Sequence, residues 1–379
     1  MLETDVVVFE QSLNYDESGN VIHEVRKLND DITTIDNEYN KRGELTKSTQ
    51  VNGLTTTVYT YLISPYGNKS EVIDIYQDDI LHTTTKAYVY NHLNQLESLT
   101  VGSVESEFEY DEYGNLILET NGSSTKSYSY DLNNRLIEAV EEGQTLQFTY
   151  DGNGNRLTKS IGSTVVQYVN DTTIENEQVL SYKVGTDVTN LSYGLTRLNE
   201  DAIGYLSDSY GNIVQHGIET YAYTPYGELT QGIINGVNEA GYKGEVHDTS
   251  SLQYLRARTY NTKLKQFLSE DTVVGKDTHT LSQNRYAFVL NNPFKYSDPS
   301  GHYAIPVMME DRFTTTPSTS TRTTQNQTNQ SSKTSTSNPV KKETPKIDKS
   351  FVSARLETEY KKEVEQSQKS YTSAQEVIQ

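Results

Sequence analysis

The chain has 379 residues, with 32 Lys and Arg against 52 Asp and Glu, so its formal net charge at pH 7 is −20. A field of this sign repels phosphate backbones, which argues against nucleic-acid binding by the repeat region. Cysteine is absent, which excludes disulfides, thiolate metal sites and a cysteine nucleophile. We expect no membrane span, because no apolar run is long enough. We also expect no signal peptide, because the start, MLETDVVVFE, is acidic rather than basic.

A phrase that begins with an aromatic residue and Asp or Asn recurs along the first part of the chain. It opens at Tyr15 and Tyr39, and then every twenty residues at Tyr90, Tyr110, Tyr130 and Tyr150. Asp at the first position of a type I turn, followed by Gly or Asn in the left-handed position, is typical of a hairpin. Apolar and polar residues alternate beside the turn, as in QTLQFTYD. Each unit is therefore predicted to be a β-hairpin, and consecutive hairpins to extend one sheet with tyrosines laddered across its strands.

The composition adds 29 tyrosines, eight phenylalanines and no tryptophan. These rings predict either a tyrosine-faced core or a surface that stacks on glycans. The acidic turns could bind calcium, but neither the EF-hand spacing nor the glycine-rich nonapeptide is present, so we interpret them as turns. The seven histidines lack metal-ligand spacing and are expected at the surface. No metal site and no cofactor are predicted.

Two later segments carry a resemblance to a known family. GYKGEVHDTSSLQYLRARTYNTKLKQFLSEDTVVG (241–275) and NRYAFVLNNPFKYSDPSG (284–301), together with the Tyr-Asp phrases, resemble the RHS/YD-repeat proteins. That family includes bacterial wall-associated proteins, components of insecticidal toxin complexes, and teneurins. The resemblance covers roughly residues 10–301. It implies an all-β fold, in which hairpins form a coiled sheet strip, here a partial shell, and an RHS-associated core plugs one end.

The resemblance also implies an activity. In the family the core is an intramolecular aspartyl protease that cuts the chain shortly after an Asp-Pro-x-Gly turn. Matched by motif, the catalytic residues fall on Arg258, Asp271 and Asp298. The cleavage region then comprises Gly301, His302, Tyr303 and Ala304.

The chemistry is consistent with these residue types. Peptide hydrolysis needs a base for water and an acid for the leaving amine, and two close carboxylates cannot both ionise, so one can supply the acid. A nearby arginine would orient one carboxylate. Purely structural roles are the alternative. Asp298-Pro-Ser-Gly301 suits a type I turn, Arg258 could pair with a carboxylate of the shell, and Asp271 could cap a loop.

The predicted organisation has four parts: a hairpin strip (1–235), the RHS-associated core (236–301), a low-complexity linker (302–345) and a helical variable tail (346–379). Ser and Thr dominate the linker, which predicts disorder. In the tail, Val352, Leu356, Tyr360 and Val364 recur every four residues, which predicts a short helix.

The resulting hypothesis is the C-terminal part of a toxin-type shell that encapsulates its own tail as cargo and cuts itself to release it. Such a protein would have an upstream shell or secretion partner and a cognate immunity protein, and would be secreted or associated with the cell wall of a bacterium. One alternative is a non-enzymatic cell-surface module that binds carbohydrate or mediates adhesion. The other is a degenerate shell fragment.

Overall fold

The computed structural model describes residues 9–307, except residues 79, 142, 175, 195, 235–236 and 276–279. A strip of 21 strands dominates it, and each strand pairs antiparallel with the next along the chain. The strands are β1 (Phe9–Tyr15), β2 (Val21–Leu28), β3 (Asp31–Tyr39), β4 (Leu45–Asn52), β5 (Thr55–Ile63), β6 (Lys69–Gln77), β7 (Ile80–Tyr90), β8 (Leu96–Val101), β9 (Val104–Tyr110), β10 (Leu116–Asn121), β11 (Ser124–Tyr130), β12 (Leu136–Glu141), β13 (Gln144–Tyr150), β14 (Arg156–Ile161), β15 (Thr164–Asp171), β16 (Gln178–Val184), β17 (Asp187–Tyr193), β18 (Arg197–Glu200), β19 (Ile203–Ser207), β20 (Ile213–His216) and β21 (Glu219–Thr220).

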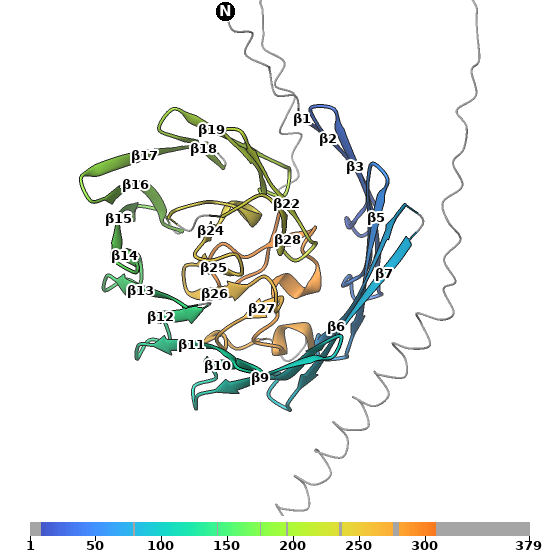
Figure 1. Ribbon diagram of the computed structural model, residues 1–379, viewed down its shortest axis with the longest axis horizontal. Helices are drawn as coiled ribbons and strands as arrows, with labels where there is room; N and C mark the ends of the chain where they lie inside the picture. The colour runs from blue at the N-terminus through green and yellow to red at the C-terminus, as the bar shows by residue number, and fades with distance from the viewer. Residues whose placement is uncertain are drawn as a thin grey trace, which may run out of the picture.

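Shorter elements follow the strip. Their bounds are β22 (Ala222–Tyr223), β23 (Leu229–Gln231), the 3-10 turn η1 (Tyr242–Gly244), β24 (Val246–His247), β25 (Leu252–Leu255), β26 (Arg258–Asn261), β27 (Gln266–Phe267), η2 (Thr280–Gln283), η3 (Val289–Asn291), β28 (Tyr296–Ser297) and β29 (Ile305–Pro306). Strands β24 to β27 form a small sheet of their own. We call the described residues of 237–307 the inner segment, because the strip curves around them without closing on itself (Figure 1).

The repeated turn has the chemistry that its sequence predicts. In the turn Asp111–Asn115, Asp111 Oδ1 accepts the N–H groups of Tyr113 and Asn115 at 2.9 and 2.8 Å. Gly114 has φ +79°, and Asn134 occupies the same position of a later turn with φ +59°. A carboxylate that accepts two backbone N–H groups fixes the turn, while Gly or Asn tolerates the left-handed conformation. The hairpin prediction is confirmed.

The tyrosine of each phrase joins one hairpin to the next. The hydroxyl of Tyr130 donates to the carbonyl oxygen of Leu116 at 3.0 Å, and that of Tyr150 to Leu136 at 2.6 Å. Tyr193 repeats the contact on Val179 at 2.9 Å. In each case the acceptor lies 14 residues earlier, at or near the start of a strand in the preceding unit. A second set of rings, which includes Tyr88 and Tyr128, is buried, so these tyrosines belong to the core, together with leucines and phenylalanines.

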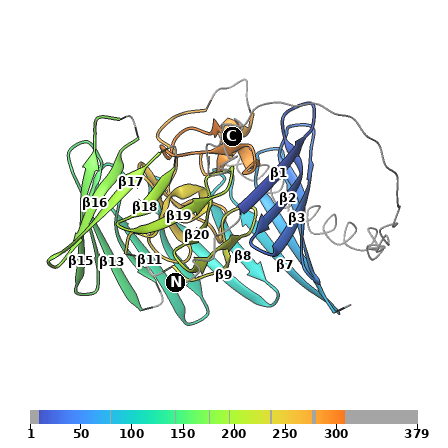
Figure 2. The same ribbon diagram turned by 90° about the horizontal axis from the view of Figure 1, so that it is seen from above.

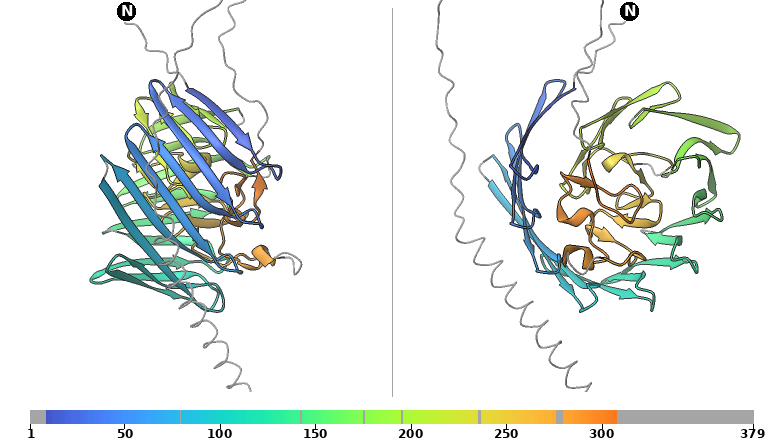
Figure 3. Two further views of the ribbon diagram at one scale, coloured as in Figure 1. Left: turned by 90° about the vertical axis from the view of Figure 1, so that its right-hand side faces the viewer. Right: turned by 180° about the vertical axis from the view of Figure 1, so that it is seen from behind.

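The inner segment is fastened to the rim of the strip formed by the Tyr-Asp turns. Its side chains donate to turn carbonyl oxygens in the order of the hairpins: Lys295 to Ser18 (2.7 Å), Asn292 to Gly43 (2.7 Å), Asn291 to Gly67 (2.8 Å) and Tyr286 to Gly114 (2.8 Å). The last described residues, in orange, therefore lie at one rim of the strip (Figures 2 and 3). The phrase NRYAFVLNNPF (284–294) thus contacts successive repeats.

A buried ion-pair cluster makes a second junction. Arg156 on β14 binds Asp248 of the inner segment through both guanidinium nitrogens, Nη1 to Oδ1 at 2.6 Å and Nη2 to Oδ2 at 2.9 Å. Lys159 adds a contact to Oδ1 at 3.1 Å. The three residues are at most 3% exposed. The cluster joins the middle of the strip to the inner segment.

The all-β class and the hairpin strip are confirmed. The predicted C-terminal helix and residues 308–345 of the predicted linker lie outside the described residues, whereas residues 302–307 of that linker are described and include β29. One expectation is wrong: His247 is buried. Burial lowers its pKa to about 4, and its Nε2 accepts the N–H of Tyr242 at 3.2 Å. In the described part of the chain, no helix has the length and hydropathy to cross a membrane.

Candidate active site

Three short strands of the inner segment bring Arg258, Asp271 and Asp298 together. Arg258 opens β26, Asp271 follows β27 after three residues, and Asp298 follows β28 directly. Arg258 Nη2 lies 2.9 Å from Asp271 Oδ2 and 3.7 Å from Asp298 Oδ2. The residues are 6%, 8% and 4% exposed, respectively. One guanidinium therefore holds two carboxylates in a site that is largely closed to water.

The guanidinium of Arg258 is oriented by three further contacts. Its plane lies over the ring of Phe267, 3.6 Å from the ring centroid. Nη1 donates to the carbonyl oxygen of Arg285 at 2.8 Å, and Nε donates to that of Gly301. A planar, always charged group fixed on several sides suits the stabilisation of negative charge.

The carboxylate of Asp298 faces the backbone that follows its own turn. Oδ1 accepts the N–H groups of His302 and Tyr303, each at 3.0 Å, and the hydroxyl of Ser300 at 3.1 Å. The turn itself is closed by a long bond from Gly301 N–H to Asp298 O at 3.4 Å. Asp298 is therefore in contact with the chain immediately beyond Gly301.

One peptide bond is bonded at both ends by these side chains. In the Gly301–His302 bond, the carbonyl oxygen accepts from Arg258 Nε, and the N–H donates to Asp298 Oδ1. The ring Nδ1 of His302 lies 2.8 Å from Asp271 Oδ1. Gly301 has φ +76°, and a Cβ there would lie 2.3 Å from the carbonyl oxygen of Leu255. Only glycine fits at this approach.

Burial shifts the ionisation of the site. It raises the pKa of Asp298 above its ordinary value, against the opposing effects of Arg258 and the hydrogen bonds from Ser300, Tyr303 and His302. Burial lowers the pKa of Arg258 to about 10, although Asp271 and Asp298 act in the opposite direction. Arg258 remains charged at neutral pH, while Asp298 retains its proton to a higher pH than an exposed aspartate does.

The structure brings the three predicted catalytic residues into contact with Gly301, His302 and Tyr303 of the predicted cleavage region. Ala304 packs instead against the apolar cluster that includes Phe288 and Phe294. The contacts of Ser300, Phe267 and Arg285 were not predicted. Ser300 and Phe267 lie inside the phrases SDPSG and FLSED, but the Arg285 contact uses a backbone oxygen, which side-chain patterns do not reveal.

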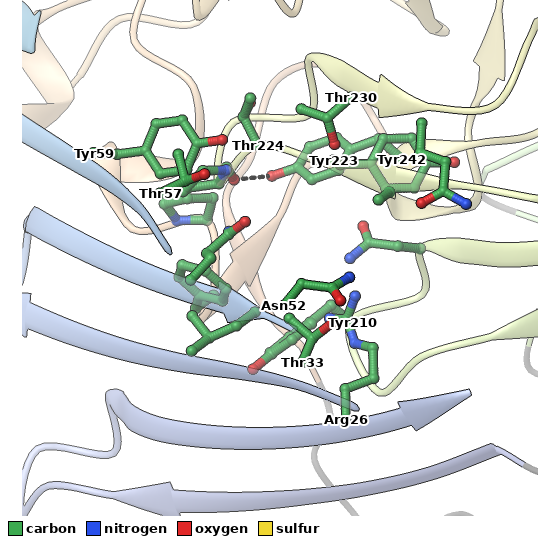
Figure 4. A pocket seen from close by; sticks show the side chains of 18 of the residues that line it. Arg26, Thr33, Asn52, Thr57, Tyr59, Tyr210, Tyr223, Thr224, Thr230 and Tyr242 are labelled. Atoms are coloured by element: carbon green, nitrogen blue, oxygen red, sulfur yellow. Dashed lines mark hydrogen bonds between the residues drawn. The ribbon is translucent and has the colours of Figure 1, made fainter. Parts of the chain in front are cut away.

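A cavity of about 320 Å³ lies apart from this site, between the first strands of the strip and residues 210–243 (Figure 4). Its walls carry hydroxyl, amide and aromatic side chains, among them Thr33, Thr57, Tyr59, Tyr210 and Tyr223. None of the three candidate catalytic residues lines it.

Comparison with known proteins finds sequence relatives of this chain. The chain is 28% identical over 284 residues to the tRNA3(Ser)-specific nuclease WapA of Bacillus spizizenii, and 29% identical over 285 residues to the tRNA nuclease WapA of Bacillus subtilis. Each match covers 70% of this chain and 12% of the relative. The chain thus spans about an eighth of the length of these relatives. No protein-family model matches it.

Solved structures give a more distant likeness. A crystal structure of TcdB2-TccC3-Cdc42 aligns with a TM-score of 0.36 and 14% identity, over 77% of this chain and 20% of that one. The Photorhabdus luminescens Tc holotoxin pore aligns with a TM-score of 0.34 and 15% identity, over 79% and 20%.

Proposed function

This chain belongs to the RHS/YD-repeat family, and we propose on that premise that it cuts itself at the Gly301–His302 peptide bond. The observation that carries the proposal is the bonding of both ends of this one bond, the carbonyl oxygen by Arg258 and the nitrogen by Asp298. A static turn needs an acceptor for its N–H groups, but it does not need a buried cation on the carbonyl oxygen of the same bond.

The proposed roles follow from these contacts. Asp271 takes a proton from a water molecule, whose oxygen attacks the carbonyl carbon of Gly301. Arg258 stabilises the negative charge that develops on the Gly301 oxygen, as an oxyanion hole does. In the intact chain, Asp298 Oδ1 accepts the His302 N–H at 3.0 Å. Once the attack has made this nitrogen tetrahedral and given it a lone pair, the protonated Asp298 carboxyl donates its proton to it as the carbon–nitrogen bond breaks. Gly301 ends as a carboxylate and His302 as a free amine, with one water consumed.

The electrostatics support Asp298 as the general acid and Asp271 as the general base. A general acid must hold its proton near the working pH, and burial raises the pKa of Asp298 in that direction. Asp271 has the closer contact to the Arg258 guanidinium, 2.9 Å against 3.7 Å. This closer contact orients the Asp271 carboxylate for its role as the base.

Cleavage would separate residues 302–379 from the strip. We propose that the strip and the inner segment act as a toxin-type shell and plug, and that the released segment is the cargo. The WapA relatives are named as tRNA nucleases, which fits an effector as the cargo. We propose delivery between bacteria as the context, with secretion to the cell surface and a cognate immunity protein as partner. Many of the tyrosines are bonded or buried, which weakens the compositional argument for a glycan-binding surface.

The test is the intact mass of the purified full chain. We expect two fragments whose masses sum to that of the chain plus one water, with the smaller beginning His302-Tyr303-Ala304 on N-terminal sequencing. Asp298→Asn and Asp271→Asn should leave the chain whole. The matched control is Asp151→Asn, because Asp151 also accepts two backbone N–H groups in a turn but lies outside the site. An uncut wild-type chain would make Asp298 a turn residue.

A further inference from the structure

One turn of the strip bonds directly to the backbone that leads into Asp271. The N–H of Leu116 donates to the carbonyl oxygen of Leu268 at 2.8 Å, and the N–H of Glu270 donates to that of Gly114 at 3.2 Å. Asn115 and Ser269 pair between these two bonds as an antiparallel bridge. Residues 268–270 are therefore held beside the turn Asp111–Asn115 through an isolated β-bridge, and Asp271 is the next residue.

The same turn also contacts the other backbone support of the site. The hydroxyl of Tyr286 donates to the carbonyl oxygen of Gly114 at 2.8 Å. Arg285, the residue before Tyr286, offers its carbonyl oxygen to the N–H of Asp271 at 3.2 Å and to Nη1 of Arg258 at 2.8 Å. The turn therefore contacts Glu270, the residue before Asp271, and Tyr286, the residue after Arg285, whose carbonyl oxygen bonds Asp271.

Gly114 makes this approach sterically possible. A Cβ on Gly114 would lie 2.7 Å from the hydroxyl of Tyr286, 2.8 Å from Glu270 Oε2 and 3.0 Å from Glu270 Cβ. Gly154 occupies the same turn position two units later, with φ +96°, and a Cβ there meets nothing within 4 Å. The difference between the two glycines is therefore contact with the inner segment, and not backbone conformation.

We propose that the turn Asp111–Asn115 positions Asp271 for self-cleavage, with Gly114 as the positioning residue. The inference rests on the proposed function and adds a regulation to it: the site becomes complete when the hairpin β9–β10 docks on the inner segment. The strip then takes part in cleavage. In a chain whose strip has not formed, the turn Asp111–Asn115 does not position Asp271, and we expect self-cleavage to be slow.

The experiment compares Gly114→Asn with Gly154→Asn. Asparagine is native at this turn position in Asn94 and Asn134, whose φ values are 63° and 59°, so both variants keep an accepted backbone conformation. The rate of appearance of the 302–379 fragment is followed after cell-free synthesis of the full chain. We expect Gly114→Asn to slow it by about 10²-fold, the effect of a misplacement of about 1 Å, and Gly154→Asn to match the wild type.

A second readout reports the position of Asp271 whether or not the chain cuts itself. In the Asp298→Asn chain, the NMR signal of the His302 ring, which contacts Asp271 Oδ1 at 2.8 Å, should shift with Gly114→Asn and stay unchanged with Gly154→Asn. If Gly114→Asn fails to fold, Tyr286→Phe replaces it, because it removes the bond to Gly114 without adding volume. It should also slow cleavage and shift the signal.

The outcomes separate the two proposals. A wild-type chain that stays whole refutes self-cleavage, and the ring signal then decides the positioning role alone. A folded Gly114→Asn chain that cuts at the wild-type rate, or whose His302 signal is unchanged, overturns the positioning role and leaves self-cleavage standing.

Discussion

Removing the charge of Asp248 should loosen the inner segment from the strip. The carboxylate binds Arg156 in a two-point contact at 2.6 and 2.9 Å and Lys159 at 3.1 Å. The side chains of Arg156 and Lys159 are 3% and 0% exposed, so Asp248→Asn leaves two buried cations without a counter-charge. Breaking a buried ion pair on one side costs about 3–5 kcal/mol, and we expect the free energy of unfolding to fall by that amount.

The assay is urea denaturation followed by tyrosine fluorescence and circular dichroism, with Glu38→Gln as control. Glu38 pairs with Lys47 at 3.0 Å, and their side chains are 64% and 25% exposed, so that loss should be about 0–1 kcal/mol. A loss for Asp248→Asn within about 1 kcal/mol of the control's would refute the reasoning, because the buried cations would then be stabilised without Asp248.

The pH dependence of this effect has a defined sign. Burial raises the pKa of Asp248, but Arg156 and Lys159 lower it further, so the net pKa is below its ordinary value. A carboxyl with a depressed pKa contributes stability above its unfolded pKa of about 3.9, and loses that contribution as the pH falls through the folded value. The difference between wild type and Asp248→Asn should therefore be full at neutral pH and shrink below about pH 4.

Three further predictions address the repeat and the site. Tyr130→Phe removes the hydroxyl that bonds Leu116 at 3.0 Å and should lower the free energy of unfolding by about 0.5–1.5 kcal/mol in urea; no loss would contradict the joining role of these tyrosines. Gly301→Ala, whose Cβ would lie 2.3 Å from the Leu255 oxygen, should abolish self-cleavage in a mass measurement while the strip stays folded by circular dichroism; normal cleavage would be evidence against the tight approach. The rate of self-cleavage should fall with rising pH as Asp298, whose pKa is raised by burial, loses its proton; a rate that instead rises with pH through this step would reverse the roles of the two aspartates.

Local chemistry in the sequence was sufficient for the hairpins. Asp111 and Gly114 predict their turn because the carboxylate and the left-handed glycine act within five residues. The contact of Tyr130 with Leu116 was harder to foresee, since it requires the register between neighbouring strands. The bond between Arg156 and Asp248 spans 92 residues, and nothing near either residue indicates a partner.

The site shows the same division between local and distant information. The three candidate catalytic residues, Arg258, Asp271 and Asp298, were found by matching family motifs. Their spacing alone gives no signal, because no sequence pattern connects an arginine with two aspartates that lie far from it along the chain. Their contacts with the backbone at Gly301 and Arg285 depend on the folded inner segment. The burial of His247 was also missed, because an isolated histidine in EVHDTS carries no signal of its surroundings.

The most direct test of the account is the intact mass of the wild-type chain beside that of Asp298→Asn. The account predicts a wild-type chain divided between Gly301 and His302 and a variant of full mass. A wild-type chain of full mass, or a variant divided at the same bond, would contradict it.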